Sequence, residues 1–199
     1  MKRLFRFAAE VQDFCEAQRW RFFFIGGLVV QAWAESRVTK DADLTLVTGF
    51  GNDEPFVDAL LARFTPRRPD AREFALMHRV LLLQSESGLG LDIGLGGMAF
   101  EFCAAERSVL HEFLPGLKLR ICTAEDLIVF KTFAARPQDW RDVEMTIVRQ
   151  GDAKLDWRYI REQLVPLLEL KERPDLLDQL EKLRAQIRAV DEKYRGQFP

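Results

Sequence analysis

The chain has few of the residues that mark secreted, zinc-binding or membrane proteins. Its 199 residues include three cysteines (Cys15, Cys103 and Cys122) and two histidines. Three widely spaced cysteines in apolar surroundings indicate reduced core thiols and argue against a disulfide framework or a zinc site. No apolar run reaches about 18 residues, so no membrane span is expected. Charged residues interrupt the N-terminal segment too early for a signal peptide, and we predict a cytoplasmic protein.

The charge balance is also unremarkable, with a formal net charge of −2. This value excludes a global attraction to nucleic acid, so contact with RNA or DNA would need a local basic patch. The histidines, His78 on an expected strand and His111 in an expected helix, lack the partner spacing of a general base or a zinc ligand. At 48% hydrophobic, the chain has ample core for one large domain or two small ones.

Hydrophobic spacing predicts an α/β N-terminal half and an all-helical C-terminal half, with domains at 1–122 and 123–199. Residues 65–72, with two prolines and three arginines, predict an exposed basic loop. In the first half we expect helices over 4–18, 26–35 and 52–64, and strands over 22–25, from Asp41 onward, and over 74–84, 89–95 and 117–121.

The second half begins with a capping pattern at Thr123 and Asp126, which predicts a helix to about residue 135. A helix capped by Asp156 contains Pro166, which would kink or divide it. The last segment places apolar residues at alternating steps of four and three: Leu176, Leu180, Leu183, Ile187, Val190 and Tyr194. This seam favours either packing on its own domain or a homodimer through the C-terminal helix.

A Gly-Gly pair follows the short apolar strand at 22–25 and opens a helix. Gly26 and Gly27 could serve only close packing between helix and strand. Their backbone N–H groups are, however, bare at a helix N-terminus, where phosphate binds well. Because two aspartates follow about one helix length later, the pair predicts a phosphate-binding loop.

Asp41 and Asp43 belong to the next strand, and the alternation of side chains puts both on one face. A divalent metal is the simplest way to relieve their repulsion. Asp92 lies between Gly90 and Gly94 on a later strand whose other face is apolar. Three carboxylates on adjacent strands can bind two Mg²⁺ or Mn²⁺ ions, which indicates phosphoryl or nucleotidyl transfer. The alternatives are an exposed strand edge for the pair and a turn aspartate for Asp92.

A second charged cluster follows in the helical half. Lys131 has mostly apolar neighbours, so its amine either reaches solvent or contacts an anion, and we expect a triphosphate contact. Asp139 and Asp142 are three residues apart on one helical face, which is also typical of the charge pattern at a helix start. We expect one of the two to reach the site, with Asp142 pairing with Lys131.

Three motifs occur in the order found in a known family: GG…RVTKDADLTL (Gly26 to Leu46), LDIGLG (Leu91 to Gly96) and EDLIVFK…RPQDWRDVE (Glu125 to Glu144). Together they resemble the AbiE-type nucleotidyltransferase toxins of the DNA polymerase β-like nucleotidyltransferase superfamily. The superfamily usually has Gly-Ser where this chain has Gly-Gly, which removes a hydroxyl contact to phosphate, but the AbiE-type group commonly accepts Gly-Gly.

The resemblance implies a mixed twisted sheet backed by helices, followed by a helical domain. It assigns triphosphate binding to Gly26 and Gly27, metal binding to Asp41, Asp43 and Asp92, and the later family positions to Lys131 and Asp142. It further implies a toxin that adds nucleotides to tRNA and is opposed by a cognate antitoxin.

We therefore predict a Mg²⁺-dependent nucleotidyltransferase that moves a nucleoside monophosphate from an NTP to an acceptor hydroxyl and releases pyrophosphate. The expected acceptor is RNA, in particular tRNA, within a toxin–antitoxin pair. One alternative is transfer to a small molecule or a protein side chain. The other is a nucleotide-binding sensor without turnover.

Overall fold

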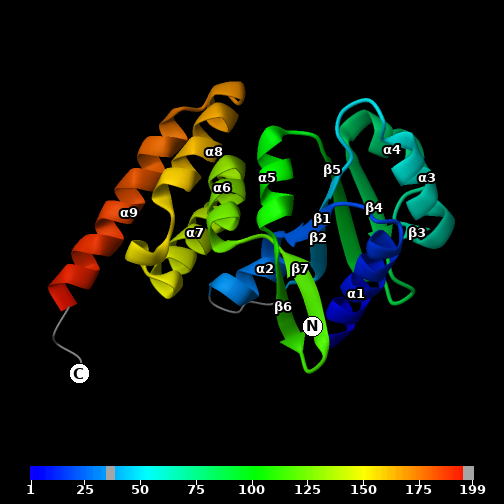
Figure 1. Ribbon diagram of the computed structural model, residues 1–199, viewed down its shortest axis with the longest axis horizontal. Helices are drawn as coiled ribbons and strands as arrows, with labels where there is room; N and C mark the ends of the chain where they lie inside the picture. Colours follow the sequence, from blue (N-terminus) through cyan, green and yellow to red (C-terminus); the bar gives the residue numbers. More distant parts are fainter. Residues whose placement is uncertain (35–38, 195–199) are drawn as a thin grey trace. The chain divides into compact units, whose positions relative to one another are not determined.

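The computed structural model describes residues 1–34 and 39–194, which form two compact units (Figure 1). Over the described residues, the first comprises 1–32 and 39–123, and the second 33–34 and 124–194. The first unit contains, in order, α1 (Lys2–Ala17), β1 (Phe22–Ile25), most of α2 (Gly26–Trp33), β2 (Asp41–Val47), α3 (Glu54–Arg63), β3 (Thr65–Pro66), α4 (Ala71–His78), β4 (Val80–Gln84), β5 (Gly90–Gly96), α5 (Ala99–Arg107), β6 (Val109–Leu114) and β7 (Leu117–Ile121). The second contains α6 (Ala124–Ala134), α7 (Pro137–Gln150), η1 (Asp152–Lys154), α8 (Trp157–Leu170) and α9 (Asp175–Tyr194).

A mixed sheet, seven-stranded over the described residues, organises the first unit in the order β3-β4-β5-β2-β1-β7-β6. The pairs β2–β5 and β1–β7 are parallel, and the other neighbouring strands are antiparallel. One face of the three strands β4, β5 and β2 is fully buried through Leu81, Leu83, Leu91, Ile93, Leu44 and Leu46. The predicted α/β class, with a mixed sheet and a helical C-terminal part, is confirmed.

The first helix is fixed to this sheet by both apolar and polar contacts. α1 contacts β7 and β2, with Val11 and Cys15 fully buried on its apolar stripe. The Gln12 side chain bridges it to β7: Nε2 donates to the Lys118 carbonyl at 3.0 Å, and the Arg120 amide donates to Oε1 at 2.8 Å. Burial raises the pKa of the Cys15 thiol to about 12, as expected for a core thiol.

Residues 74–84, expected as one strand, are divided between α4 and β4, so that part of the prediction is wrong. Ala71 and Ala75 lie four residues apart and bury one face of α4. Arg79 ends the helix in the left-handed conformation, at φ 56°. The alternation that suggested a long strand therefore holds only over β4, and His78 lies in a helix.

Two further elements of the first unit differ from expectation. His111, expected in a helix, lies on β6, which pairs with β7 across the predicted Pro-Gly turn. α5 had no counterpart in the sequence pattern. Glu101 satisfies its start, because Oε2 accepts hydrogen bonds from the amides of Gly97 at 2.8 Å and Met98 at 2.9 Å.

The helical unit keeps α8 whole. Pro166 was expected to kink or divide this helix, yet α8 continues from Trp157 to Leu170 with the proline inside it. Ile160, Leu164 and Leu168 are almost completely buried on both sides of the proline. A shared core therefore holds the two halves together despite the missing backbone N–H.

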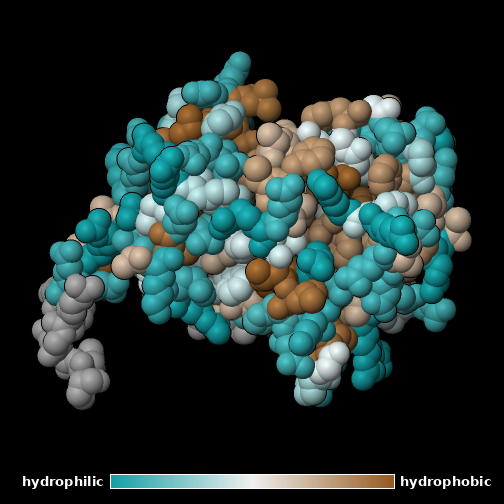
Figure 2. Space-filling model, in the orientation of Figure 1, coloured by the Kyte–Doolittle hydropathy of each residue, from teal (hydrophilic) through white to brown (hydrophobic). Residues whose placement is uncertain are grey.

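The apolar seam of α9 packs largely within the helical unit. Leu176, Leu180 and Ile187 are 1%, 2% and 6% exposed, whereas Val190 is 55% exposed. α9 contacts α6, α7 and α8, and its visible face is mainly hydrophilic (Figure 2). This burial favours the first interpretation of the seam, packing on its own domain. Among the described residues, no helix has the length and apolar character needed to cross a membrane.

Candidate active site

Asp41, Asp43 and Asp92 lie on one face of two neighbouring strands; we call them the acidic cluster. The parallel register of β2 and β5 pairs Asp43 with Asp92 and Asp41 with Gly90. Paired strands are about 4.8 Å apart, so Asp43 and Asp92 are side by side. The placement of all three aspartates on one face agrees with the sequence pattern.

Two glycines leave room for these carboxylates. A Cβ at Gly26 would lie 2.0 Å from Asp43 Oδ2, and a Cβ at Gly90 would lie 2.3 Å from Asp41 Oδ1. Gly26 also has a φ of +68°, which strains other residues. Since Ile25 on β1 pairs with Asp43, the first residue of α2 stands directly against the acidic cluster. The positive end of a helix and three carboxylates therefore meet at one place.

The acidic cluster is partly open to solvent. The side chains of Asp41 and Asp92 are 54% and 36% exposed. Farther along the strands, α5 covers the same face, since a Cβ at Gly96 would lie 2.9 Å from Thr45 Cγ2 and 3.1 Å from a side chain of α5. Partial burial raises the pKa of the Asp92 carboxyl above its ordinary value, although Arg67 opposes the rise.

One cation contacts the acidic cluster without having been singled out from the sequence. Arg67 forms an ion pair with Asp92, and its Nη1 lies 3.9 Å from Asp41 Oδ1. It belongs to residues 65–72, expected as a solvated basic loop, which begin instead with the edge strand β3. Only the pairing of β3 with β4 and of β4 with β5 brings Arg67 to an aspartate 25 residues away. A run of three arginines carried no signal for this contact.

The chemistry of the acidic cluster fits a hard divalent cation. Its donors are carboxylate oxygens, the ligands that Mg²⁺ prefers, and Gly26 and Gly90 leave space for them. In the described part of the chain, no three Asp, Glu, His or Cys side chains converge closely enough to hold a metal ion. The guanidinium of Arg67 pairs with one carboxylate and approaches a second. The residue types of the acidic cluster thus fit a metal site, but the three carboxylates do not converge on one point, and Arg67 contacts two of them.

The helical unit holds a second set of charges, the buried ion cluster of Lys131, Arg136, Asp139 and Asp142. Lys131 Nζ donates to Asp139 Oδ1 at 2.8 Å and to Asp142 Oδ2 at 2.7 Å. The side chains of Lys131, Asp139 and Asp142 are 6%, 1% and 3% exposed, whereas that of Arg136 is 74% exposed. Asp139 Oδ2 also accepts from the Arg136 amide at 3.1 Å and from Arg136 Nε at 2.7 Å, which satisfies the start of α7.

The expected pairing of Lys131 with Asp142 is confirmed, and Asp139 shares the same ammonium. Burial on its own would raise the pKa of the Asp139 carboxyl, but the hydrogen bonds from Arg136 and Lys131 lower it below its ordinary value. The lysine expected to contact a triphosphate is thus already paired with two carboxylates.

No family model and no curated protein matches the chain by sequence. Among solved structures, the chain is similar to an antigenic nucleotidyltransferase-like protein from Paracoccidioides brasiliensis, with a TM-score of 0.52, 14% identity, and 89% of this chain and 92% of that chain covered. It is also similar to the antibiotic-resistance factor ANT(2'')-Ia (TM-score 0.48, 16% identity, coverage 84% and 91%). A further similar structure is the lincosamide antibiotic adenylyltransferase LnuA with lincomycin bound, with a TM-score of 0.44, 12% identity, and 69% of this chain and 92% of that chain covered. The first likeness shows that the chain has the fold of nucleotidyltransferase-like proteins.

Proposed function

We propose that this protein is a metal-dependent nucleotidyltransferase, which moves a nucleoside monophosphate from an NTP to an acceptor hydroxyl. The observation that carries the proposal is the acidic cluster beside the first residue of α2, in a chain with this fold. Gly26 and Gly27 would bind the triphosphate, and the acidic cluster would hold Mg²⁺ or Mn²⁺. The transferase domain would span 1–122 and the helical domain 123–199.

In this reaction the acceptor oxygen bonds to the α-phosphorus, and the bond from that phosphorus to the β-phosphate oxygen breaks, so pyrophosphate leaves. The N–H groups at the start of α2 bind and orient the triphosphate beside Asp43. Asp92, next to Asp43, takes the proton of the acceptor hydroxyl. A bound Mg²⁺ supplies neutralisation of the phosphate charge. Catalysis rests mainly on positioning and electrostatics.

Lys131 and Asp142 keep a proposed place in the same activity. The motif resemblance supports a triphosphate contact by Lys131. Its hydrogen bonds to Asp139 and Asp142 would then hold the ammonium in one position. Because Lys131 is buried in the helical unit, its substitution could lower stability as well as triphosphate binding. Stability and activity of a Lys131 variant are therefore measured together.

We propose RNA, in particular tRNA, as the acceptor, and a cytoplasmic toxin opposed by an antitoxin as the biological role. The motif resemblance supports the toxin role. A hollow of about 420 Å³ in the first unit supports a polyanionic acceptor, since Arg3, Arg6 and Arg63 in its lining outnumber the acidic residues Glu10 and Glu86. The β4–β5 turn also lines this hollow, and Gly90 just after the turn pairs with Asp41. The local basic patch and the acidic cluster thus lie at the same end of the sheet.

A small-molecule hydroxyl or a protein side chain is the second candidate acceptor. The formal net charge of −2 favours it, because no global attraction would draw RNA to the protein. In the hollow, Arg63 Nη2 is 2.8 Å from Glu10, which reduces the positive charge available to a polyanion. The choice between acceptors therefore depends on a direct measurement.

The test incubates the protein with each α-labelled NTP, Mg²⁺ and total cellular RNA, and then separates RNA, protein and small molecules. We expect labelled RNA and released pyrophosphate. The double variant R3A/R6A should label less RNA without altering the acidic cluster. A labelled small molecule or protein would favour the second candidate, and NTP binding without release would favour a sensor. Orthophosphate release without a labelled acceptor would reject nucleotidyl transfer.

A further inference from the structure

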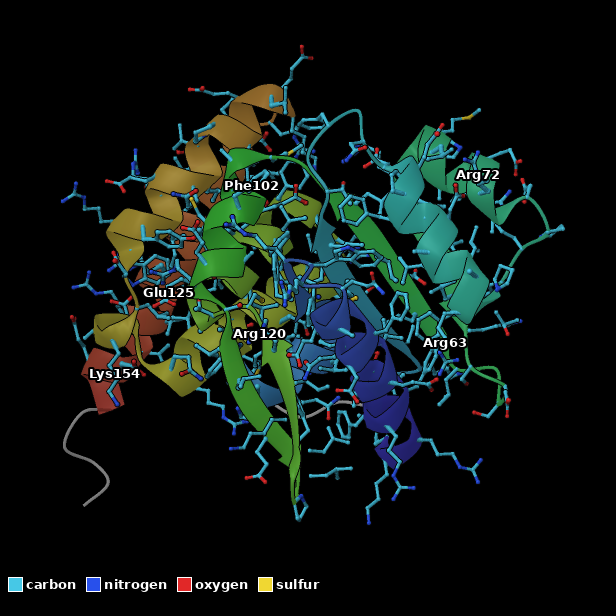
Figure 3. All side chains as sticks on the ribbon, turned by 45° about the vertical axis from the view of Figure 1, so that its right-hand side comes forward. Arg63, Arg72, Phe102, Arg120, Glu125 and Lys154 are labelled. Atoms are coloured by element: carbon cyan, nitrogen blue, oxygen red, sulfur yellow. The ribbon has the colours of Figure 1, made fainter. Side chains whose placement is uncertain are left out.

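Arg67 differs from the two other arginines of its segment in what it contacts. Arg68 pairs with Asp70 at 2.6 Å and stacks over Phe74. Arg72 extends from α4 and pairs with Asp58 of α3 at 2.6 Å (Figure 3). Among the contacts of the described residues, Arg67 is the one arginine of these three that contacts the acidic cluster. A Cβ at Gly90 would lie 2.6 Å from Arg67 Nη1, so the glycine also makes room for the guanidinium.

The backbone of Arg67 is anchored, but its side chain is not enclosed. The Arg67 amide donates to the Leu82 carbonyl at 2.9 Å, and Leu82 is the cross-strand partner of Asp92. The guanidinium therefore extends over Leu82 to reach Asp92. Its side chain is 31% exposed, which leaves it a path into solvent. The side chain can consequently swing away while β3 stays paired with β4.

The guanidinium and a divalent ion need the same oxygens. Mg²⁺ requires its oxygen ligands at about 2.0–2.1 Å in near-ideal geometry. An Asp92 oxygen held in the ion pair with Arg67 is not free to meet this requirement. Cation and side chain therefore compete for the oxygens of Asp92 and Asp41.

We propose that Arg67 is a positioning residue that holds Asp92 and Asp41 in the protein without metal and must swing away before a divalent ion can bind. It lowers the affinity for metal and relieves the repulsion between the two carboxylates at the same time. Metal loading is thereby coupled to displacement of one side chain of the segment between β3 and α4. This inference rests on the proposed function of the acidic cluster as a metal site.

The test measures Mn²⁺ binding to the full chain without nucleotide, from the electron paramagnetic resonance signal of free Mn²⁺. R67M keeps an apolar stem and removes the charge, and R67K keeps a charge without the fork. R68M is the matched control, because Arg68 is paired with Asp70 instead of the acidic cluster. Since a partly exposed ion pair contributes up to about 1 kcal/mol, R67M should bind Mn²⁺ roughly three- to sixfold more tightly than wild type. R67K should lie between them, and R68M should equal wild type.

Unchanged or weaker Mn²⁺ binding by R67M would overturn the inference. Weaker NTP binding by R67M with unchanged Mn²⁺ affinity would also overturn it and assign Arg67 to the triphosphate. If wild type transfers labelled nucleotide in a Mn²⁺-dependent way while R67M binds no more tightly, this inference fails and the proposed function stands. If wild type neither binds Mn²⁺ nor transfers nucleotide, both fail.

Discussion

The acidic cluster and the buried ion cluster use the same kinds of side chain in different balance. In the acidic cluster, Arg67 contacts Asp92 and approaches Asp41, and the side chains of these two aspartates are 36% and 54% exposed. The buried ion cluster has two carboxylates against two cations, and its carboxylates, on Asp139 and Asp142, are 1% and 3% exposed. The carboxylates of the first cluster lie near solvent, whereas those of the second are buried around Lys131, and Arg136, 74% exposed, approaches Asp139 from the surface.

This difference separates ligand binding from stability. Buried charges cost free energy unless they are paired and hydrogen-bonded, so a buried cluster has to be complete within the chain itself. Carboxylates near solvent need no complete set of partners within the chain, because water solvates them, and they remain accessible to a cation from solution. Substitutions in the acidic cluster should therefore lower activity without lowering stability, whereas substitutions in the buried ion cluster should lower stability as well as any triphosphate binding by Lys131.

The largest effect is expected from Asp43→Ala or Asp41→Ala. Removing a carboxylate from the acidic cluster should lower nucleotidyl transfer at least about a thousandfold, or about 4 kcal/mol of barrier. The free energy of unfolding measured in urea should be unchanged or slightly higher, because the remaining carboxylates lose a like-charged neighbour. Labelled transfer and urea unfolding are measured together. Asp70→Asn, an exposed aspartate paired with Arg68, is the control and should keep full activity; equal activity in all variants would remove the assignment.

Lys131→Met should act in the opposite way, chiefly on stability. It leaves two buried carboxylates without their ammonium, and breaking such a group typically costs about 3 kcal/mol or more of the free energy of unfolding. Urea unfolding followed by circular dichroism gives this value.

A double change supplies the control for this prediction. Lys131→Met with Asp142→Asn removes one positive and one negative charge, so it should recover part of the lost stability. If Lys131→Met unfolded like wild type but transferred nucleotide poorly, the lysine would serve ligand binding alone, and the contrast between the two clusters would be wrong.

The sequence predicts the carboxylate side of this comparison better than the cation side. Asp41, Asp43 and Asp92 stand at positions of a strand pattern that local alternation and flanking glycines reveal. Arg67 depends on the pairing of three strands, and such long-range pairing leaves no local pattern. Two errors of the sequence prediction have related causes. The short helix α4 is followed directly by the alternating pattern of β4, so the two were predicted as one strand. In α8, burial against the rest of the unit keeps the helix continuous through Pro166.

A smaller effect should follow from filling the space beside Asp43. Gly26→Ala adds a Cβ that would lie 2.0 Å from Asp43 Oδ2, at a φ of +68°. Gly88→Ala is a matched control, because Gly88 has a φ of +75° and nothing within 4 Å of the added Cβ. Both changes should cost about 1 kcal/mol of stability through backbone strain. Only Gly26→Ala displaces the Asp43 carboxylate, and transfer should fall at least about tenfold in that variant. Equal activity would show that the spacing between α2 and Asp43 is unimportant.

The smallest effect concerns acid, and it again sets the buried ion cluster apart. The hydrogen bonds from Arg136 and Lys131 outweigh the effect of burial and lower the pKa of Asp139 in the folded protein. The unfolded chain therefore binds this proton more tightly, and folding is favoured where the carboxyl is ionised. The stabilisation is complete above the ordinary aspartate pKa of about 3.9 and is lost as pH falls through the lower pKa of the folded state.

Asp139→Asn should be less stable than wild type at neutral pH, and its free energy of unfolding should fall less on acidification. Urea unfolding at a series of pH values from about 6 down to about 3 measures the difference. Curves for the two proteins that stay parallel throughout would show that Asp139 contributes no acid-dependent stability.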